Sequence, residues 1–176
     1  MKENIQVTRS KEWIFNALMF LLKKNAFRKI SIEDITKKAG VARPTFYRNF
    51  DSKEDVLIDQ GRKIYERLMI DLESSMDEGN VTYNSIKKII IIFDEYSELF
   101  EVLINNNLEY LIFQSFDVEI SNLLKKILGV DKEDKYKSKF FEGALFSIAI
   151  EWIKNAKKES VETMTEIIYN LVALNK

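Results

Sequence analysis

The chain of 176 residues contains neither cysteine nor histidine. The lack of cysteine excludes disulfide bonds, thiolate metal sites and a cysteine nucleophile. The lack of histidine removes the commonest metal ligand and the usual general base of enzymes. The sequence also contains no paired-carboxylate motif and no glycine-rich phosphate-binding loop. We therefore expect no cofactor, no metal and no enzymatic activity.

Long hydrophobic runs are absent as well. The longest, which include ALMFLL and IIIIF, fall far short of the about 18 residues that a membrane-spanning helix needs. The N-terminal sequence MKENIQVTRSKEW has no apolar stretch of the kind found in signal peptides. Apolar residues make up 46% and charged residues 31% of the chain, which is typical of soluble globular proteins. We expect a cytoplasmic protein with no membrane partner.

One proline and five glycines leave few positions that would break a helix. Apolar residues recur at helical spacing almost throughout, and in the first predicted helix Trp13, Ala17, Leu18, Leu21 and Leu22 share one face. We therefore predict an all-α fold. The predicted helices span residues 9–25, 32–39, 44–50, 52–75, 82–105, 106–117, 119–128, 134–157 and 161–174.

Capping signals organise the first third of the chain. Ser31 with Asp34, and Ser52 with Asp55, show the spacing of a capping box. In a capping box each side chain accepts a hydrogen bond from the other residue's backbone amide at the start of a helix. Gly40 follows the second predicted helix directly and suits the left-handed conformation that ends helices. The predicted order is a capped short helix, a glycine turn, a second short helix and a capped long helix.

Two short helices joined by a tight turn make a helix-turn-helix, whose second helix lies in the major groove of DNA. Phe46 and Phe50 are four residues apart and are expected to face the core, which leaves the polar residues of RPTFYRNF on the outer side. Arginine and asparagine can read guanine and adenine, and hydroxyls and helix starts can hold phosphates. The predicted DNA-contacting residues are Ser31, Arg43, Pro44, Thr45, Tyr47, Arg48, Asn49 and Lys53. Periodicity alone also fits a plain helical hairpin whose polar side faces water.

Charge is divided unevenly along the chain. Residues 1–60 contain 12 Lys and Arg against 8 Asp and Glu, whereas residues 61–176 contain 15 against 20. The N-terminal third is therefore basic and the remainder acidic. Such asymmetry favours contact between the N-terminal part and a polyanion.

Residues 30–57, ISIEDITKKAGVARPTFYRNFDSKEDVL, resemble the DNA-binding signature of TetR/AcrR-type transcriptional regulators. The resemblance implies that Thr45, Tyr47 and Lys53 mainly hold phosphates, and that residues 43, 44, 48 and 49 face base edges or the adjacent backbone. It implies a helix-turn-helix DNA-binding domain, placed at residues 1–55, and a helical ligand-binding and dimerisation domain at residues 56–176. The expected partners are double-stranded DNA with a palindromic operator and a second copy of the chain. Thr36 departs from the family, which commonly has alanine there.

The segment KFFEGALFSIAIEWIKNAKKES carries apolar residues on nearly every side of one predicted helix. A helix of this kind is buried all round, so a partner is expected to cover one face. This stretch also resembles the C-terminal part of the DhaS-like branch of the family. The predicted dimer-interface residues are Phe140, Phe141, Ala144, Ile148, Trp152, Ile167, Ile168 and Leu171. The alternative is that both C-terminal helices simply close the core of the monomer.

Aromatic residues gather between positions 93 and 116, and aromatic walls suit an apolar ligand. The residues predicted to line such a pocket are Phe93, Tyr96, Phe100, Tyr110, Phe113 and Gln114. An aromatic stripe at helical spacing is equally compatible with ordinary core packing.

The favoured hypothesis is a dimeric, sequence-specific transcriptional regulator, a repressor that a small apolar or aromatic effector releases from DNA. One alternative is a DNA-binding co-regulator whose C-terminal bundle binds a protein. Another is a small helical enzyme or lipid-binding protein, which the missing histidine and cysteine disfavour.

Overall fold

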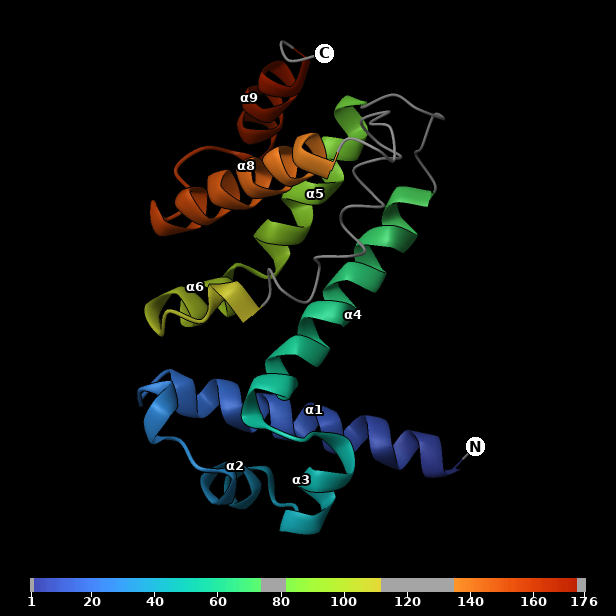
Figure 1. Cartoon of the computed structure of the whole chain (residues 1–176), viewed down its shortest axis with the longest axis vertical. Helices are drawn as coiled ribbons and strands as arrows, with labels where there is room; N and C mark the ends of the chain where they lie inside the picture. Colours follow the sequence, from blue (N-terminus) through green and yellow to red (C-terminus); the bar gives the residue numbers. More distant parts are fainter. Residues whose placement is uncertain (1, 74–81, 112–134, 174–176) are drawn as a thin grey trace. The chain divides into compact units, whose positions relative to one another are not determined.

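The computed structural model describes residues 2–73, 82–111 and 135–173, and every regular element in these ranges is a helix (Figure 1). This confirms the predicted all-α fold. The helix predicted at residues 119–128 and the second half of the one predicted at 106–117 lie outside the described residues, as do the pocket candidates Phe113 and Gln114.

The chain divides into two units. Unit 1 contains residues 2–62 and 102–111, and unit 2 contains residues 63–73, 82–101 and 135–173. The expected boundary at 55/56 therefore differs from this division. The difference arises because helix α4 (Lys53–Glu73) and helix α6 (Ser97–Asn105) each contribute residues to both units.

Unit 1 is built on three N-terminal helices and a short 3-10 turn. These are α1 (Lys2–Leu22), η1 (Phe27–Lys29), α2 (Ile32–Ala39) and α3 (Arg43–Asn49). Its core is formed by fully buried side chains that include Ile14, Leu18, Ile35, Phe46 and Leu57. Residues from α1, α2, α3 and α4 thus share one core, which fixes α3 against the rest of the unit.

Helix α1 differs from its prediction in two ways. It begins at Lys2 rather than at residue 9, and Trp13 is 52% exposed although it was predicted on the inner face. The buried stripe consists of Ile14, Ala17, Leu18 and Leu22. Trp13 lies in the predicted helix but not on its buried face. The buried stripe begins at Ile14, one residue after Trp13.

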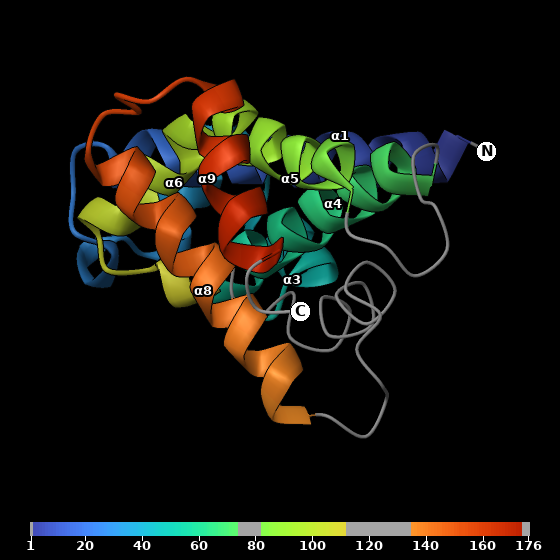
Figure 2. The same ribbon diagram turned by 90° about the horizontal axis from the view of Figure 1, so that it is seen from above.

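Unit 2 includes α5 (Tyr83–Glu95), α8 (Lys135–Lys154) and α9 (Val161–Ala173), and α9 packs across α5 (Figure 2). The single helix predicted at 82–105 is interrupted at Tyr96, so that α5 and α6 are separate. The Lys157 ammonium lies at this break. It donates hydrogen bonds to Asp94 at 2.7 Å and to Ser97 at 2.9 Å, which holds the ends of the two helices together.

Candidate nucleic-acid interface

The turn between α2 and α3 has the geometry that the sequence predicts. Gly40 has φ 67° and ψ 30°, in the left-handed region, and the amide of Val41 donates to the carbonyl of Thr36 at 3.1 Å. Ser31 and Asp34 form the predicted capping box, since each side chain accepts a hydrogen bond from the other residue's backbone amide. The turn therefore ends α2 and redirects the chain into α3 within three residues.

Helix α3 has only seven residues, and its position depends on its inner face. Phe46 is fully buried, Phe50 is nearly so, and their ring centroids are 5.9 Å apart. Pro44 lies in the first turn, where its missing N–H leaves no hydrogen bond unmade. The two phenylalanines anchor the helix, and its opposite face is open to solvent.

The exposed face of α3 presents two arginines, each braced by a neighbour on the same helix. Arg43 donates to the hydroxyl of Tyr47 at 3.2 Å, and Arg48 donates to the hydroxyl of Thr45 at 3.1 Å. The hydrogen bond to Tyr47 raises the pKa of Arg43 above its ordinary value. Each brace holds a cation on the outer face, where an anionic partner can reach it.

Two predicted DNA-contacting residues donate hydrogen bonds inside unit 1. The amide nitrogen of Asn49 donates to the carbonyl of Thr45 at 2.7 Å and to the hydroxyl of Ser10 in α1 at 3.3 Å. The Lys53 ammonium donates to the carbonyls of Phe27 at 2.7 Å and of Ile30 at 2.8 Å. Asn49 therefore fastens α3 to α1, and Lys53 fastens α4 to the segment that precedes α2.

A further contact secures this segment from its other side. The amide oxygen of Asn106 accepts a hydrogen bond from the backbone amide of Phe27 at 3.3 Å, and its nitrogen donates to the carbonyls of Leu22 and Val102. Lys53 and Asn106 thus hold the carbonyl and the amide of the same residue. Asn106 therefore has a structural role in unit 1.

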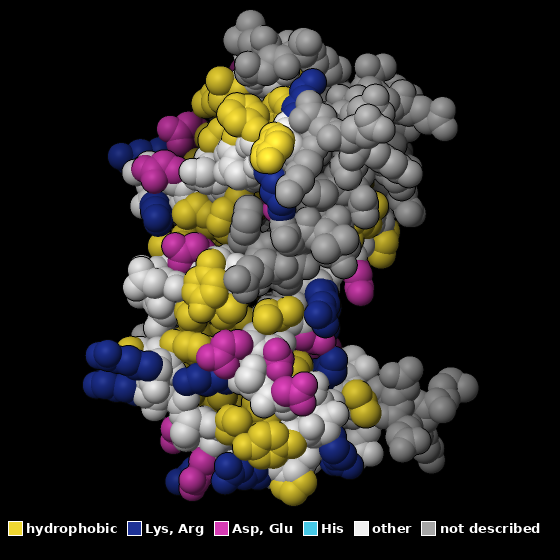
Figure 3. Space-filling view, viewed as in Figure 1, with side chains coloured by type: hydrophobic (Ala, Val, Ile, Leu, Met, Phe, Trp, Pro, Cys, Tyr) yellow, Lys and Arg dark blue, Asp and Glu magenta, His cyan; other side chains and the backbone are white. Residues whose placement is uncertain are grey.

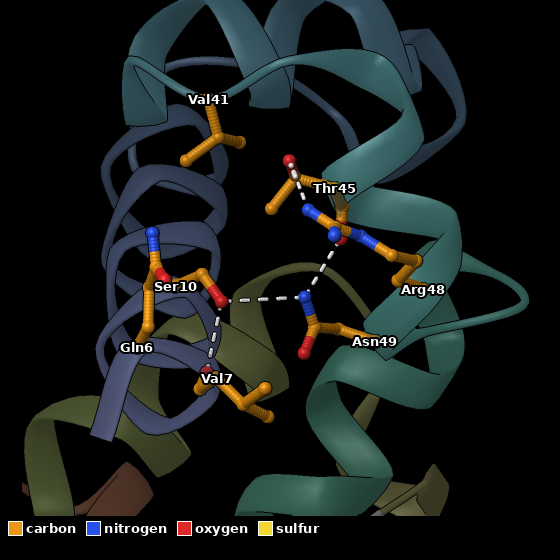
Figure 4. Close-up of a pocket in the computed structure, with 7 residues that line it drawn as sticks. All are labelled: Gln6, Val7, Ser10, Val41, Thr45, Arg48 and Asn49. Carbon is orange, nitrogen blue, oxygen red and sulfur yellow. Dashed lines mark hydrogen bonds between the residues drawn. The ribbon is translucent and has the colours of Figure 1, made fainter. Parts of the chain in front are cut away.

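A hollow lies between α1 and α3, and we refer to it as the α1–α3 hollow (Figure 4). Its volume is about 490 Å³. It is lined by Gln6, Val7, Ser10, Val41, Thr45, Arg48 and Asn49. The sequence predicted Thr45, Arg48 and Asn49 at the interface but missed the α1 residues. Ser10 carried a usable signal, because it is a polar residue one helical turn before the buried stripe of α1.

The surface of unit 1 over α2 and α3 is rich in basic side chains, which are visible along the lower edge of the space-filling view (Figure 3). Lys37 and Lys38 end α2, and Arg43 and Arg48 are exposed on α3. This location agrees with the basic character that the sequence assigns to the N-terminal third.

The residues predicted at the dimer interface divide between the core and the surface of unit 2. Phe141, Trp152 and Ile168 are buried, and the indole of Trp152 donates to the carbonyl of Glu159 at 2.9 Å. Phe140, at 62%, and Leu171, at 45%, are exposed. A further predicted residue, Ile167, is also exposed.

An apolar groove of about 230 Å³ lies between α8 and α9, and we refer to it as the α8–α9 groove. Its lining includes six predicted interface residues, namely Phe140, Phe141, Ala144, Ile148, Ile168 and Leu171. A β-carbon placed on Gly143 would meet no atom within 4 Å, so the helix surface is open there. The two C-terminal helices therefore present an apolar surface as well as closing the core.

The residues predicted to line a ligand pocket are not gathered into one described cavity. The ring of Phe93 packs at a tilt on the buried ring of Phe100, with centroids 4.9 Å apart. Phe93 also contacts the ring of Phe146, with centroids 6.4 Å apart. Tyr96 caps α5, and Tyr110 belongs to unit 1, where it is exposed. Among these rings, Phe93 therefore packs on both Phe100 and Phe146.

The described residues contain no cluster of three or more acidic side chains arranged to hold a metal ion. No helix within the described ranges combines the length and apolarity needed to cross a membrane.

Comparisons with known proteins identify both parts of the chain. Residues 10–59 match the sequence model of the bacterial regulatory proteins of the tetR family, and residues 80–173 match that of a transcriptional regulator C-terminal region. The second match alone covers more than half of the chain. The two matched regions correspond to the helix-turn-helix and to the C-terminal helices.

Two curated relatives and one solved structure show the extent of the similarity. The dhaKLM operon transcriptional activator DhaS of Lactococcus lactis is 29% identical over 126 residues, which is 69% of this chain and 62% of that protein. The transcriptional regulator EthR of Mycolicibacterium smegmatis is 53% identical over 38 residues, 22% of this chain and 18% of that protein. Each alignment thus spans less than two thirds of the relative's length. The crystal structure of Lin0861 from Listeria innocua has a TM-score of 0.81 at 19% identity, covering 98% of this chain and 93% of that one, and it supports the fold. From the two matching sequence models and this shared fold, we conclude that the chain belongs to the TetR family of bacterial regulatory proteins.

Proposed function

We propose that the chain is a sequence-specific DNA-binding transcriptional regulator that places α3 in the major groove. The observation that carries this proposal is the division of α3 into two faces. Phe46 and Phe50 hold the inner face in the core, and Arg43, Tyr47 and Arg48 project from the outer face. A short helix that is rigidly mounted and cationic on its free side is what a helix-turn-helix inserts into DNA. The family match supports the same role.

We further propose that the chain acts as a homodimer through the exposed apolar surface formed by the α8–α9 groove, Phe140, Ile167 and Leu171. Soluble monomers rarely expose contiguous apolar surface, and the same surface on a second copy can cover it by two-fold symmetry. A two-fold dimer presents two recognition helices, and these fit a palindromic operator whose half-sites lie about 34 Å, or a multiple of it, apart.

The regulatory role that we propose is that of a repressor released by a small apolar or aromatic effector. Release would follow if the effector changed the spacing of the two recognition helices. A second candidate is a co-regulator whose C-terminal part binds a protein. The packing of Phe93 on Phe100 and on Phe146 favours this second candidate, because these rings occupy space that an effector would need.

Selection from a random duplex library on the immobilised full chain tests DNA recognition. We expect the recovered sequences to share two half-sites in inverted orientation. The matched control is the Phe46→Ala variant, which loses the anchor of α3 and should recover no common sequence. Recovery of unrelated sequences by the unaltered chain would contradict the proposal.

A thermal-shift screen of small apolar and aromatic compounds, followed by DNA release, separates the two regulatory candidates. A compound that raises the melting temperature and releases the selected duplex supports the repressor. If no compound raises the melting temperature of the chain but binding of a protein does, the co-regulator is supported.

A further inference from the structure

The α1–α3 hollow includes residues of α1, which lie outside the recognition helix α3. Gln6, Val7 and Ser10 of α1 form one wall, and Thr45, Arg48 and Asn49 of α3 form the wall opposite (Figure 4). Val41, in the turn between α2 and α3, closes one end. The hollow therefore joins two elements far apart in sequence into one concave surface beside α3.

The walls are held at a fixed spacing by hydrogen bonds. Asn49 donates to Ser10 at 3.3 Å, and the Ser10 hydroxyl donates in turn to the carbonyl of Val7 at 2.9 Å. Ser10 is buried, so this bridge forms the floor of the hollow. A preformed concave surface binds without first having to be ordered, which favours a partner of matching shape.

The chemistry of the lining favours an anion. Arg48 is the single ionisable residue among the seven, and none of them is acidic. The guanidinium has five N–H donors, and its bond to Thr45 leaves donors for a ligand. Gln6 is exposed on the opposite wall and brings an amide that can donate. Val7 and Val41 add methyl groups suited to an apolar edge such as a sugar ring.

We propose that the α1–α3 hollow seats one phosphate of the DNA backbone with its sugar, and that Arg48 and Gln6 are the ligands of that phosphate. The proposal rests on the proposed function and extends the DNA-binding surface to α1. A helix in the major groove is flanked by the sugar–phosphate strand, and an element packed beside that helix meets the strand rather than the base edges. Arg48 thereby positions the protein on DNA, whereas the sequence alone leaves it free to read a base.

The test measures DNA affinity of the full chain by fluorescence anisotropy across a salt series, with the selected duplex and a scrambled duplex of equal length. We expect Arg48→Gln to lower the slope of log affinity against log salt by about 0.9, the contribution of one phosphate contact, on both duplexes. We expect Gln6→Ala to weaken binding to both by about tenfold, since a hydrogen bond to a charged group is lost. Matched controls are Arg62→Gln and Gln60→Ala on α4, which should leave slope and affinity unchanged. Melting temperatures verify that all variants fold.

Duplexes in which one phosphate at a time is replaced by a neutral methylphosphonate locate the contact. At one position per half-site the replacement should lower the DNA affinity of the unaltered chain. The same replacement should not lower the affinity of Arg48→Gln any further. Additive losses at every position would overturn the proposal, as would a change of preference at a single base pair in Arg48→Gln.

The two proposals can fail separately. Equal affinity of the unaltered chain for both duplexes contradicts sequence-specific regulation, yet the slope on scrambled DNA still reports on the hollow. If the unaltered chain binds selectively but Arg48→Gln leaves the slope of log affinity against log salt unchanged, only the proposal for the α1–α3 hollow is overturned. Absence of any DNA binding overturns both.

Discussion

At the scale of single residues, Lys53 connects stability to DNA binding. Its ammonium is the hydrogen-bond donor for two backbone carbonyls that precede α2, and it lies 4.2 Å from the centre of the Phe27 ring. An ammonium has three N–H donors, so one is left for a phosphate after these two bonds are made. The same side chain can therefore brace the helix-turn-helix and contact DNA.

We predict that Lys53→Met lowers the free energy of unfolding by about 1 to 2 kcal/mol, because two carbonyls lose a charged donor. The variant should also bind selected and scrambled duplexes more weakly by the same factor, since a phosphate contact carries no sequence information. Chemical denaturation and anisotropy measure the two effects. A variant with normal stability, or with altered sequence preference, would refute this assignment.

Asp34 gives the cap of α2 a dependence on pH. The hydrogen bonds that its carboxylate accepts, first from the Ser31 side chain and then from the Ser31 backbone, hold the pKa of Asp34 below its ordinary value. A carboxyl whose folded pKa is lowered contributes stability above the unfolded pKa of about 3.9, and this contribution disappears as the pH falls through the folded pKa.

We therefore predict that Asp34→Asn lowers the melting temperature at neutral pH and that the difference from the unaltered chain narrows as the pH falls below about 4. Glu33→Gln removes the same charge from the same first turn of α2 and is the control. A difference that stays constant from pH 7 to pH 3 would show that the carboxylate does not act through its ionisation.

Residue-level prediction from sequence succeeded where the cause is local. The capping boxes and the left-handed Gly40 depend on neighbours within four residues, and both were predicted. The burial of Phe46 and Phe50 was predicted from their helical spacing. The inward direction of the Asn49 amide depends on Ser10, which is 39 residues away. No local pattern specifies such a partner, so this hydrogen bond was not predicted. The assignment of Asn49 to base edges or the adjacent backbone stays a prediction.

At the scale of elements, the turn between α2 and α3 is the part most sensitive to backbone conformation. Gly40 has φ 67°, a backbone conformation that residues with a β-carbon rarely adopt. A β-carbon placed there would nevertheless meet no atom within 4 Å. Any penalty for substitution therefore comes from the backbone and not from a clash.

We predict that Gly40→Ala destabilises the chain by about 1 kcal/mol, the cost of a left-handed conformation for a residue with a β-carbon. Asparagine tolerates this conformation better, so Gly40→Asn should be less destabilised. Denaturant titration of the three proteins measures the order. Equal losses in both variants would place the cause outside the backbone conformation of this residue.

Element boundaries were predicted less well than the existence of helices. Helical periodicity continues across Tyr96, so one helix was predicted where α5 and α6 are separate. The residue beside the break is Lys157, which is 63 residues from Asp94, and periodicity contains no information about that contact. The start of α1 was missed because residues 2–8 have too few apolar positions to show a stripe.

At the scale of the whole molecule, the apolar surface of α8 and α9 is expected to hold two copies together. We predict that the full chain sediments as a dimer and that Leu171→Glu converts it to a monomer, because a carboxylate would have to be buried beside the α8–α9 groove. The control is Ile70→Glu, since Ile70 on α4 is also exposed, at 65%, and lies outside the groove.

An unaltered chain that sediments as a monomer would contradict the dimer, and so would a Leu171→Glu variant that remains dimeric. In the first case the exposed residues would need another partner. In the second, the interface would lie on a different surface.

The sequence predicted the class of fold and the family of the DNA-binding part, and the domain boundary at 55/56 stays a prediction. The boundary was placed at a helix start, whereas the two units share α4 and α6. The aromatic residues between positions 93 and 110 could not be assigned to a pocket because helical spacing is the same for a core and for a cavity wall. In the structure Phe93 packs on Phe100, and the ligand pocket stays a prediction.

The central claim, that α3 reads a DNA sequence, is tested most directly by one measurement on the unaltered full chain. This is the ratio of its affinities for the selected duplex and for a scrambled duplex at about 0.15 M salt. We predict a ratio of about 10³ or more, the usual margin of specific over non-specific binding. A ratio near one, with tight binding to both duplexes, would mean that the basic surface of unit 1 holds DNA without reading it, and would contradict the account.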